Sequence, residues 1–161
     1  MENRKIRELE KKDILAVESI YDLYWSGDVR DNFLKRLKDY AERSPLVIAQ
    51  GFKYFIAEEN GEVVGVAALR KAPDFMKEFT KTDNPAEFYI LAVKYRGKGI
   101  GTALRKKRIE EAKKLGFTEA LFYSGETHQD SWGFHDNSDF KRIGTMVAPN
   151  GEKGQVWRME L

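Results

Sequence analysis

The chain of 161 residues has no cysteine and only two histidines. Without cysteine it forms no disulfide, thiolate zinc site or iron–sulfur cluster, and it has no cysteine nucleophile. His128 and His135 leave little for a metal centre, and their spacing from nearby carboxylates fits no common ligand pattern. We therefore expect no metal.

Long apolar runs and linker-like tracts are also missing. No apolar stretch approaches the roughly 18 residues that span a bilayer, and segment 1–13 lacks the apolar region of a secretion signal. The four prolines are dispersed, and no repeat or low-complexity tract marks a domain boundary. The sequence therefore predicts a single cytoplasmic domain over residues 1–161, without a membrane partner and able to bury about 70% of its unfolded surface.

The net charge of +2 conceals an uneven distribution. Nine basic and two acidic residues lie between Lys94 and Lys114, whereas segment 125–139 has four acids, both histidines and no Lys or Arg. A helix rich in basic residues is one possible sign of a nucleic-acid-binding module. No aromatic residue interleaves the cluster Arg105–Arg108 as a base-stacking platform would, so the sequence favours this alternative least.

Hydrophobic periodicity predicts alternating strands and helices. In chain order these are a strand at 5–9, helices at 14–24 and 31–42, strands at 54–57, 63–69 and 88–93, a helix at 100–115, a strand at 118–123, a short helix, and strands at 140–147 and 155–161. Asn60-Gly61 and Pro149-Asn150-Gly151 predict tight turns between antiparallel neighbours, and segment 71–84 predicts a long loop or a loop with a helical turn. The predicted fold class is α/β with a mixed sheet.

A glycine-rich loop follows the strand at 88–93. The sequence Arg96-Gly97-Lys98-Gly99-Ile100-Gly101-Thr102 lies where that strand turns into the next helix. Closely spaced glycines let backbone N–H groups converge at a helix N-terminus, where the helix dipole favours a phosphate. The loop lacks the Lys-Ser/Thr of a Walker loop, and Thr102 stands where a dinucleotide fingerprint has its third glycine. A phosphate site of another kind is predicted.

These residues resemble the acetyl-CoA loop of the GCN5-related N-acetyltransferase (GNAT) superfamily, written Arg/Gln-x-x-Gly-x-Gly/Ala. Arg96-Gly97-Lys98-Gly99-Ile100-Gly101 matches it, and the element order agrees from about residue 53 to 161. Residues 1–51 match only in helix placement. The resemblance implies a mostly antiparallel central sheet flanked by helices, in the order β-α-α-β-β-β-α-β-α-β-β. It also implies an N-acetyltransferase that moves an acetyl group from acetyl-CoA directly to a primary amine.

The resemblance further implies how coenzyme A would bind. Backbone N–H groups of the loop would hold the pyrophosphate, with Arg96 and Gly97 beside it; these groups belong to Lys98, Gly99, Ile100, Gly101 and Thr102. The segment Leu91, Ala92 and Val93 would pair with the pantetheine arm. Because Val93 and Arg96 are only three residues apart, either Leu91 or Val93 could be the residue that ends this pairing.

The resemblance also points to candidates for proton transfer. Glu87 matches the general base of the histone-type branch, and a solvated surface glutamate is the alternative. His135 replaces the tyrosine that protonates the departing thiolate in many members. As an imidazolium kept charged by nearby carboxylates it would serve as that acid. His128 replaces a frequent asparagine and is a weaker candidate. Tyr123 and Ser124 are alternative donors.

The acceptor is expected to be a small-molecule or peptide amine. Tyr21, Tyr24 and Trp25 could line its pocket, although aromatic residues at this helical spacing are also typical of a core. The acids Asp22, Glu126 and Asp130 would favour a cationic amine such as a polyamine, an aminoglycoside, a lysine side chain or a peptide N-terminus. The altered pattern at 134–140 leaves open a degenerate sensor that binds acetyl-CoA without transfer. Both monomer and homodimer stay open.

Overall fold

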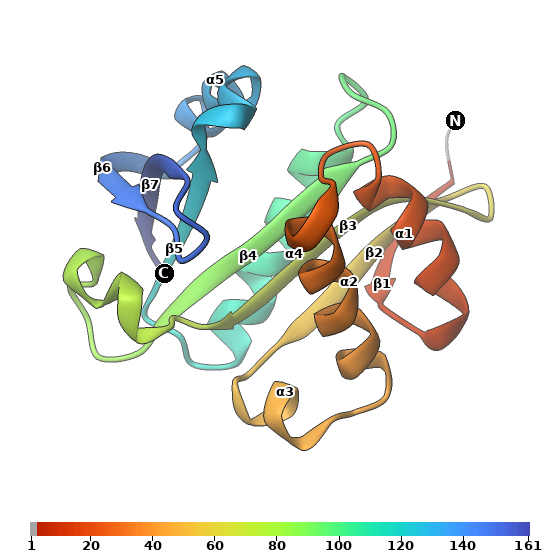
Figure 1. Ribbon diagram of the computed structural model, residues 1–161, viewed down its shortest axis with the longest axis horizontal. Helices are drawn as coiled ribbons and strands as arrows, with labels where there is room; N and C mark the ends of the chain where they lie inside the picture. Colours follow the sequence, from red (N-terminus) through yellow and green to blue (C-terminus); the bar gives the residue numbers. More distant parts are fainter. Residues whose placement is uncertain (1–2) are drawn as a thin grey trace.

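A computed structural model describes residues 3–161 as one mixed sheet with helices on both faces (Figure 1). The strands are β1 (Arg4–Glu8), β2 (Lys53–Glu59), β3 (Glu62–Lys71), β4 (Pro85–Val93), β5 (Glu119–Gly125), β6 (Lys141–Val147) and β7 (Lys153–Glu160). The α-helices are α1 (Ile14–Tyr21), α2 (Gly27–Ala41), α3 (Pro45–Ala49), α4 (Ile100–Lys114) and α5 (Trp132–Asp136). Short 3-10 helices are η1 (Lys11–Asp13), η2 (Asp74–Phe79) and η3 (Glu126–Ser131).

The strand order is β1-β2-β3-β4-β5-β7-β6, with every neighbouring pair antiparallel except β4 and β5. The predicted fold class and element order are confirmed. The single-turn helix α3 was not predicted, because it is too short to show a helical period. In the segment 71–84 the structure has the second of the two predicted forms, a loop that contains a helical turn, η2. Asn60 and Gly61 have φ of 51° and 83°, as expected of the tight turn between β2 and β3.

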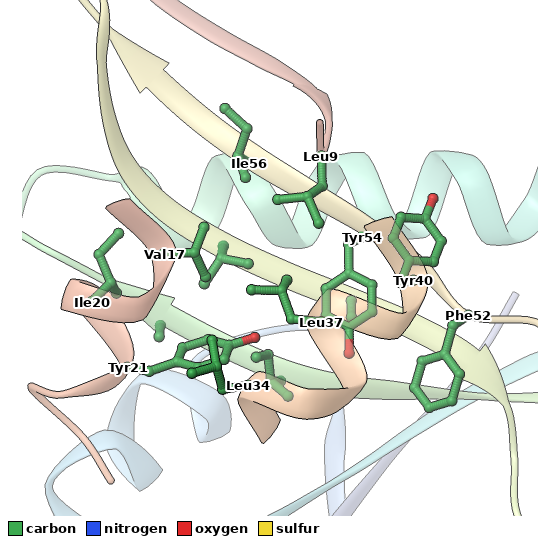
Figure 2. Close-up of a cluster of buried hydrophobic side chains, with 14 of the residues drawn as sticks. Leu9, Val17, Ile20, Tyr21, Leu34, Leu37, Tyr40, Phe52, Tyr54 and Ile56 are labelled. Atoms are coloured by element: carbon green, nitrogen blue, oxygen red, sulfur yellow. The ribbon is translucent and has the colours of Figure 1, made fainter. Parts of the chain in front are cut away.

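The two faces of the sheet are covered by different helices. On one face α1 and α2 pack on β2 and β3, and Figure 2 shows Tyr21, Leu37 and Tyr54 converging in that layer. On the other face α4 packs through Ile100 and Leu104. Because Tyr21 is fully buried in the first core, it takes no part in a substrate pocket.

The central parallel pair determines the shape of the site. β4 and β5 are paired only where Pro85–Glu87 lies beside Glu119–Leu121, and beyond these residues the two strands diverge (Figure 1). The buried carboxylate of Glu119 lies at this junction, where it accepts hydrogen bonds from Arg158 Nε at 2.9 Å and from the Lys81 N–H at 2.9 Å. β4 and β5 therefore form a V, and the buried ion pair of Glu119 and Arg158 lies at its closed end.

Candidate active site

A cavity of about 920 Å³ lies where β4 and β5 diverge. β4, the glycine loop and α4 form one wall, and β5, η3, α5 and the turn before β7 form the other. The cavity is lined by most of the site residues predicted from the sequence, namely Leu91, Val93, Arg96, Gly97, Lys98, Gly99, Ile100, Gly101, Thr102, Tyr123 and His135. Ala92 does not line it, because its side chain points into the core beneath α1 and α2.

The edge of β4 presents backbone groups to this cavity. The Lys94 N–H donates to the Val64 carbonyl at 2.8 Å, so strand alternation turns the peptide groups of Leu91 and Val93 away from β3. The Tyr24 hydroxyl donates to the Val93 carbonyl at 2.7 Å and accepts from the Val93 N–H at 3.3 Å. Val93 is thus hydrogen-bonded to Tyr24. On the same side, no strand within residues 3–161 pairs with the peptide group of Leu91.

The glycine loop ends at the N-terminus of α4. Gly97 and Gly99 have φ of 73° and 76°, which favours glycine, and Gly99 is the N-cap of the helix. A Cβ atom at Gly97 would meet nothing within 4 Å, so the space above the loop is open. The Arg4 guanidinium donates to the Lys98 carbonyl at 2.6 Å, so this carbonyl of the loop has a hydrogen-bond partner. No acidic side chain lies in the first turn of α4, and a phosphate would meet no repulsion there.

Arg96 and Asp130 form an ion pair between the two walls. Arg96 Nη1 lies 2.7 Å from Asp130 Oδ2, and the guanidinium lies 5.6 Å from the ring centre of Tyr24. The two side chains are 56% and 61% exposed, so the pair contributes little to stability. Asp130 raises the pKa of Arg96, which is in any case charged at neutral pH.

Glu87 lies outside the cavity. In the register of β3 and β4, Ala68 pairs with Ile90 and Leu69 with Phe88, so a bulge at Tyr89 reverses the alternation of side chains. Glu87 consequently packs beside Arg70, whose Nε donates to Oε1 at 2.6 Å. Burial raises the pKa of Glu87, although Arg70 opposes this effect. The general-base role stays a prediction, and this placement lends it no support.

His135 lines the cavity, but its charge differs from the expected one. Burial, together with the charges of Arg105 and Arg108, lowers the pKa of His135 to about 3. Nδ1 lies 2.7 Å from Arg105 Nη2; because a guanidinium only donates, Nδ1 accepts and the ring proton is on Nε2. The expected imidazolium is therefore wrong: the nearest charges are cations, and His135 is neutral at pH 7.

Two arginines of α4 face inward. Arg108 Nη1 donates to the carbonyls of Ala68 and Ile90, both at 3.1 Å, and so ties α4 to the bulge in β4. Burial lowers the pKa of Arg108 to about 9 and that of Arg105 to about 10. Arg105 and Arg108, the two ends of the basic cluster named above, are therefore buried and belong to no exposed basic surface. The helical spacing of Leu104, Arg108 and Ala112 was the signal that could have shown this.

Comparison with known proteins places the chain in a family. A profile of the acetyltransferase (GNAT) family matches residues 15–140. The chain belongs to the GNAT acetyltransferase family. The resemblance inferred from the glycine loop is thereby confirmed.

Solved structures with the same fold include several acetyltransferases. PaiA N-acetyltransferase from Thermoplasma acidophilum, in complex with coenzyme A, is 16% identical with a TM-score of 0.67, and the match covers 99% of each chain. An N-acetyltransferase from Staphylococcus aureus Mu50 is 20% identical with a TM-score of 0.69 and 98% of each chain covered. The ribosomal-protein-S18-alanine N-acetyltransferase from Escherichia coli is 17% identical with a TM-score of 0.68, covering 98% of this chain and 93% of the other. These likenesses show the GNAT fold.

Aromatic rings line the part of the GNAT cavity under the α1–α2 connection. Trp25 and Phe33 meet edge to face with ring centres 4.8 Å apart, and His128 lies 6.0 Å from Trp25. Tyr24 also lines the cavity, whereas Asp22 lies outside it and pairs with Arg30. Glu126 lines a smaller neighbouring pocket with His128 and Asp130.

Tyr123 and Glu152 meet on the opposite wall. The Tyr123 hydroxyl donates to the Glu152 carbonyl at 2.8 Å, and burial beside that glutamate raises the pKa of Tyr123, so the phenol stays protonated. Ser124 Oγ accepts a hydrogen bond from Trp132 Nε1 at 3.2 Å. Sequence reasoning missed Glu152, because nothing in the turn before β7 marks one of its charged residues as facing a cavity.

Among residues 3–161, no three His, Asp or Glu side chains gather as metal ligands. In the same part of the chain no helix is long and apolar enough to cross a membrane.

The neutral state of His135 predicts a pH dependence of stability. The pKa is about 6.5 in the unfolded chain and about 3 in the folded protein, so the unfolded state binds more protons between these values. The free energy of unfolding should therefore fall as the pH drops below about 6.5, by up to about 1.4 kcal/mol per pH unit from this residue. Urea unfolding of the wild type and of His135→Asn from pH 7 to 4.5 measures it. We expect a shallower slope in the variant, and parallel slopes would contradict the neutral assignment.

Proposed function

We propose that the chain transfers the acetyl group of acetyl-CoA to a primary amine inside the cavity between β4 and β5. The observation that carries this proposal is the continuity of that cavity, which runs from the glycine loop along the edge of β4 to the aromatic rings of Trp25 and Phe33. A phosphate site, a peptide edge and an acceptor pocket are then parts of one space. Calorimetric titration with acetyl-CoA tests the first half of the proposal, and a saturable heat of binding is expected.

The residues present fit coenzyme A. The open space at Gly97, the N-terminus of α4 and the cations Arg96 and Lys98 suit a pyrophosphate. The peptide group of Leu91 suits an amide of the pantetheine arm, because each has an N–H donor and a carbonyl acceptor. The arm would then pair with β4 as a neighbouring strand does. Bound acetyl-CoA would supply the thioester at the inner end of this edge.

The remaining residues would act on the amine and the thioester. The bulge at Tyr89, held by Arg108, sets the direction of the β4 peptide groups beside the reacting carbonyl. Because His135 is neutral, its Nε2–H would donate a hydrogen bond to the departing sulfur rather than act as a charged acid. Tyr123 stays the other candidate donor. The aromatic rings favour a cationic acceptor through cation–π contacts.

Removing the partner of Arg96 should strengthen coenzyme binding. Asp130→Asn frees the guanidinium for a phosphate and removes a negative charge from the cavity mouth, so we expect the Kd for acetyl-CoA to fall about two- to fivefold at low salt. The effect should shrink in 0.5 M salt because exposed charges are screened. Asp139→Asn removes an exposed acid of the same segment that does not line the cavity, and it serves as the control. An unchanged or weaker affinity in Asp130→Asn would contradict the proposed place of Arg96.

A further inference from the structure

Glu152 is a carboxylate in the cavity without a cationic partner. Two acidic side chains line this space, and the other, Asp130, is paired with Arg96. Within residues 3–161 no Lys, Arg or His forms an ion pair with Glu152. Its Oε2 accepts from the Thr127 hydroxyl at 2.6 Å, and its Oε1 lies 3.3 Å from the Tyr123 hydroxyl, whose proton it shares with the Glu152 carbonyl. Neutral hydroxyls orient a carboxylate without neutralising its charge. Glu152 therefore presents an oriented, uncompensated negative charge to the substrate space.

The backbone around Glu152 is shaped to receive its carboxylate. A Cβ atom at Gly125 would overlap Oε1 of Glu152, so the carboxylate lies directly over the Gly125 Cα. Gly125 has φ of −75°, an ordinary value for any residue, so no conformational demand explains its glycine. A Cβ atom at Gly154, the partner of Gly125 across β5 and β7, would overlap the Ser124 carbonyl. These two glycines let the turn before β7 close over β5 and bring Glu152 to the cavity wall.

We propose that Glu152 binds the ammonium group of the acceptor amine and removes its proton. This inference rests on the proposed acetyl transfer and names the acceptor as an amine that is protonated in solution. The hydroxyls of Thr127 and Tyr123 hold the two carboxylate oxygens, and the aromatic rings of Trp25 and Phe33 face the same space. An oriented carboxylate and aromatic rings that line one cavity from opposite walls favour a cation between them.

In the proposed step two protons leave the amine nitrogen, one before and one after it attacks the thioester. Glu152 accepts one proton from the ammonium and releases it to solvent, which leaves a neutral amine with a free electron pair. That pair forms the C–N bond to the thioester carbonyl carbon, the C–S bond breaks, and the sulfur keeps its electron pair. A second proton leaves the nitrogen and ends on the sulfur. The products are the amide, the free thiol of coenzyme A and one proton.

Two small acceptors of similar size separate this role from a structural one. Methylamine is protonated at pH 7, whereas hydroxylamine is neutral there and needs no proton removed before attack. We would measure thiol release from acetyl-CoA with each amine, subtract the uncatalysed rate, and compare the wild type with Glu152→Gln. General-base catalysis is worth about 10²- to 10⁴-fold. We expect kcat/KM to fall at least about a hundredfold for methylamine and less than about tenfold for hydroxylamine, with the Kd for acetyl-CoA unchanged.

Gly125→Ala provides a second variant that keeps the carboxylate. The added Cβ displaces the flexible end of Glu152 and leaves the backbone unstrained, so the methylamine-selective loss should reappear at an unchanged melting temperature. Glu160→Gln, an exposed acid on β7 outside the cavity, is the charge control and should match the wild type. Equal losses for both amines, or no loss in Glu152→Gln, overturn the role of Glu152 alone. A wild-type protein that acetylates neither of these two amines overturns the role of Glu152 toward small acceptors, and one that acetylates no amine of any size overturns the proposed function with it.

Discussion

Replacing Gly99 by glutamate is expected to abolish acetyl-CoA binding. The substitution places a negative charge at the N-cap of α4, near the proposed pyrophosphate and beside Arg4, whose Nη1 lies 3.4 Å from the position of the new Cβ, and it forces a residue with a Cβ to adopt φ of 76°. We expect the Kd measured by calorimetry to rise at least about a hundredfold, which corresponds to about 2.7 kcal/mol. A folded variant that keeps its affinity would contradict the site.

Two further variants separate charge from strain. Gly116→Glu repeats the same exchange beyond the other end of α4, at φ of 84° and with open space around it, so it carries similar strain away from the cavity. Its affinity should match the wild type. Thr102→Glu adds an acid to the first turn of α4 without a positive φ, and there an acid stabilises a helix by about 0.3–1 kcal/mol. Weaker acetyl-CoA binding at an undiminished melting temperature then reports the charge alone.

Of the substitutions considered, Glu119→Ala is expected to lower the free energy of unfolding most. The side chain of Glu119 is fully buried, and its removal leaves the Arg158 guanidinium, 9% exposed, without its main partner. It also removes the acceptor of the Lys81 N–H. Breaking a buried ion pair on one side costs about 3–5 kcal/mol, which for this chain length lowers the melting temperature by roughly 10 °C. Thermal unfolding followed by circular dichroism measures the shift.

A matched control lies on the same arginine. Glu160 is 74% exposed and lies 3.5 Å from Arg158 Nη2, so Glu160→Ala should change the free energy of unfolding by less than about 0.5 kcal/mol. Similar losses in the two variants would show that burial does not distinguish the two carboxylates. In that case the closed end of the V is not held by Glu119 in particular.

Local patterns of the sequence were sufficient for the fold and for one end of the site. Asn60-Gly61 encodes the turn between β2 and β3 in two residues, and Arg96–Thr102 encodes the strand-to-helix loop in seven. Such features depend on neighbours along the chain. The cavity placement of Leu91 and Val93 followed from the same strand and loop.

Features that depend on distant partners were not predictable from these patterns. Strict alternation puts Glu87 on the same face as Leu91, but the bulge at Tyr89 reverses it, and a bulge depends on the register with β3. The charge of His135 depends on its burial and on Arg105 and Arg108, which come from another element and outweigh the neighbouring carboxylate of Asp136. Glu152 reaches the cavity only because β7 pairs with β5.

Acetyl transfer itself is tested by amine-dependent release of coenzyme A from acetyl-CoA by the purified chain, with the products identified by mass spectrometry. The panel would include methylamine, spermidine, kanamycin, Nα-acetyl-lysine and a short peptide with a free N-terminus. The account predicts saturable thiol release matched one for one by an acetylated amine. Saturable binding of acetyl-CoA without an acetylated product from any of these amines would contradict the transferase.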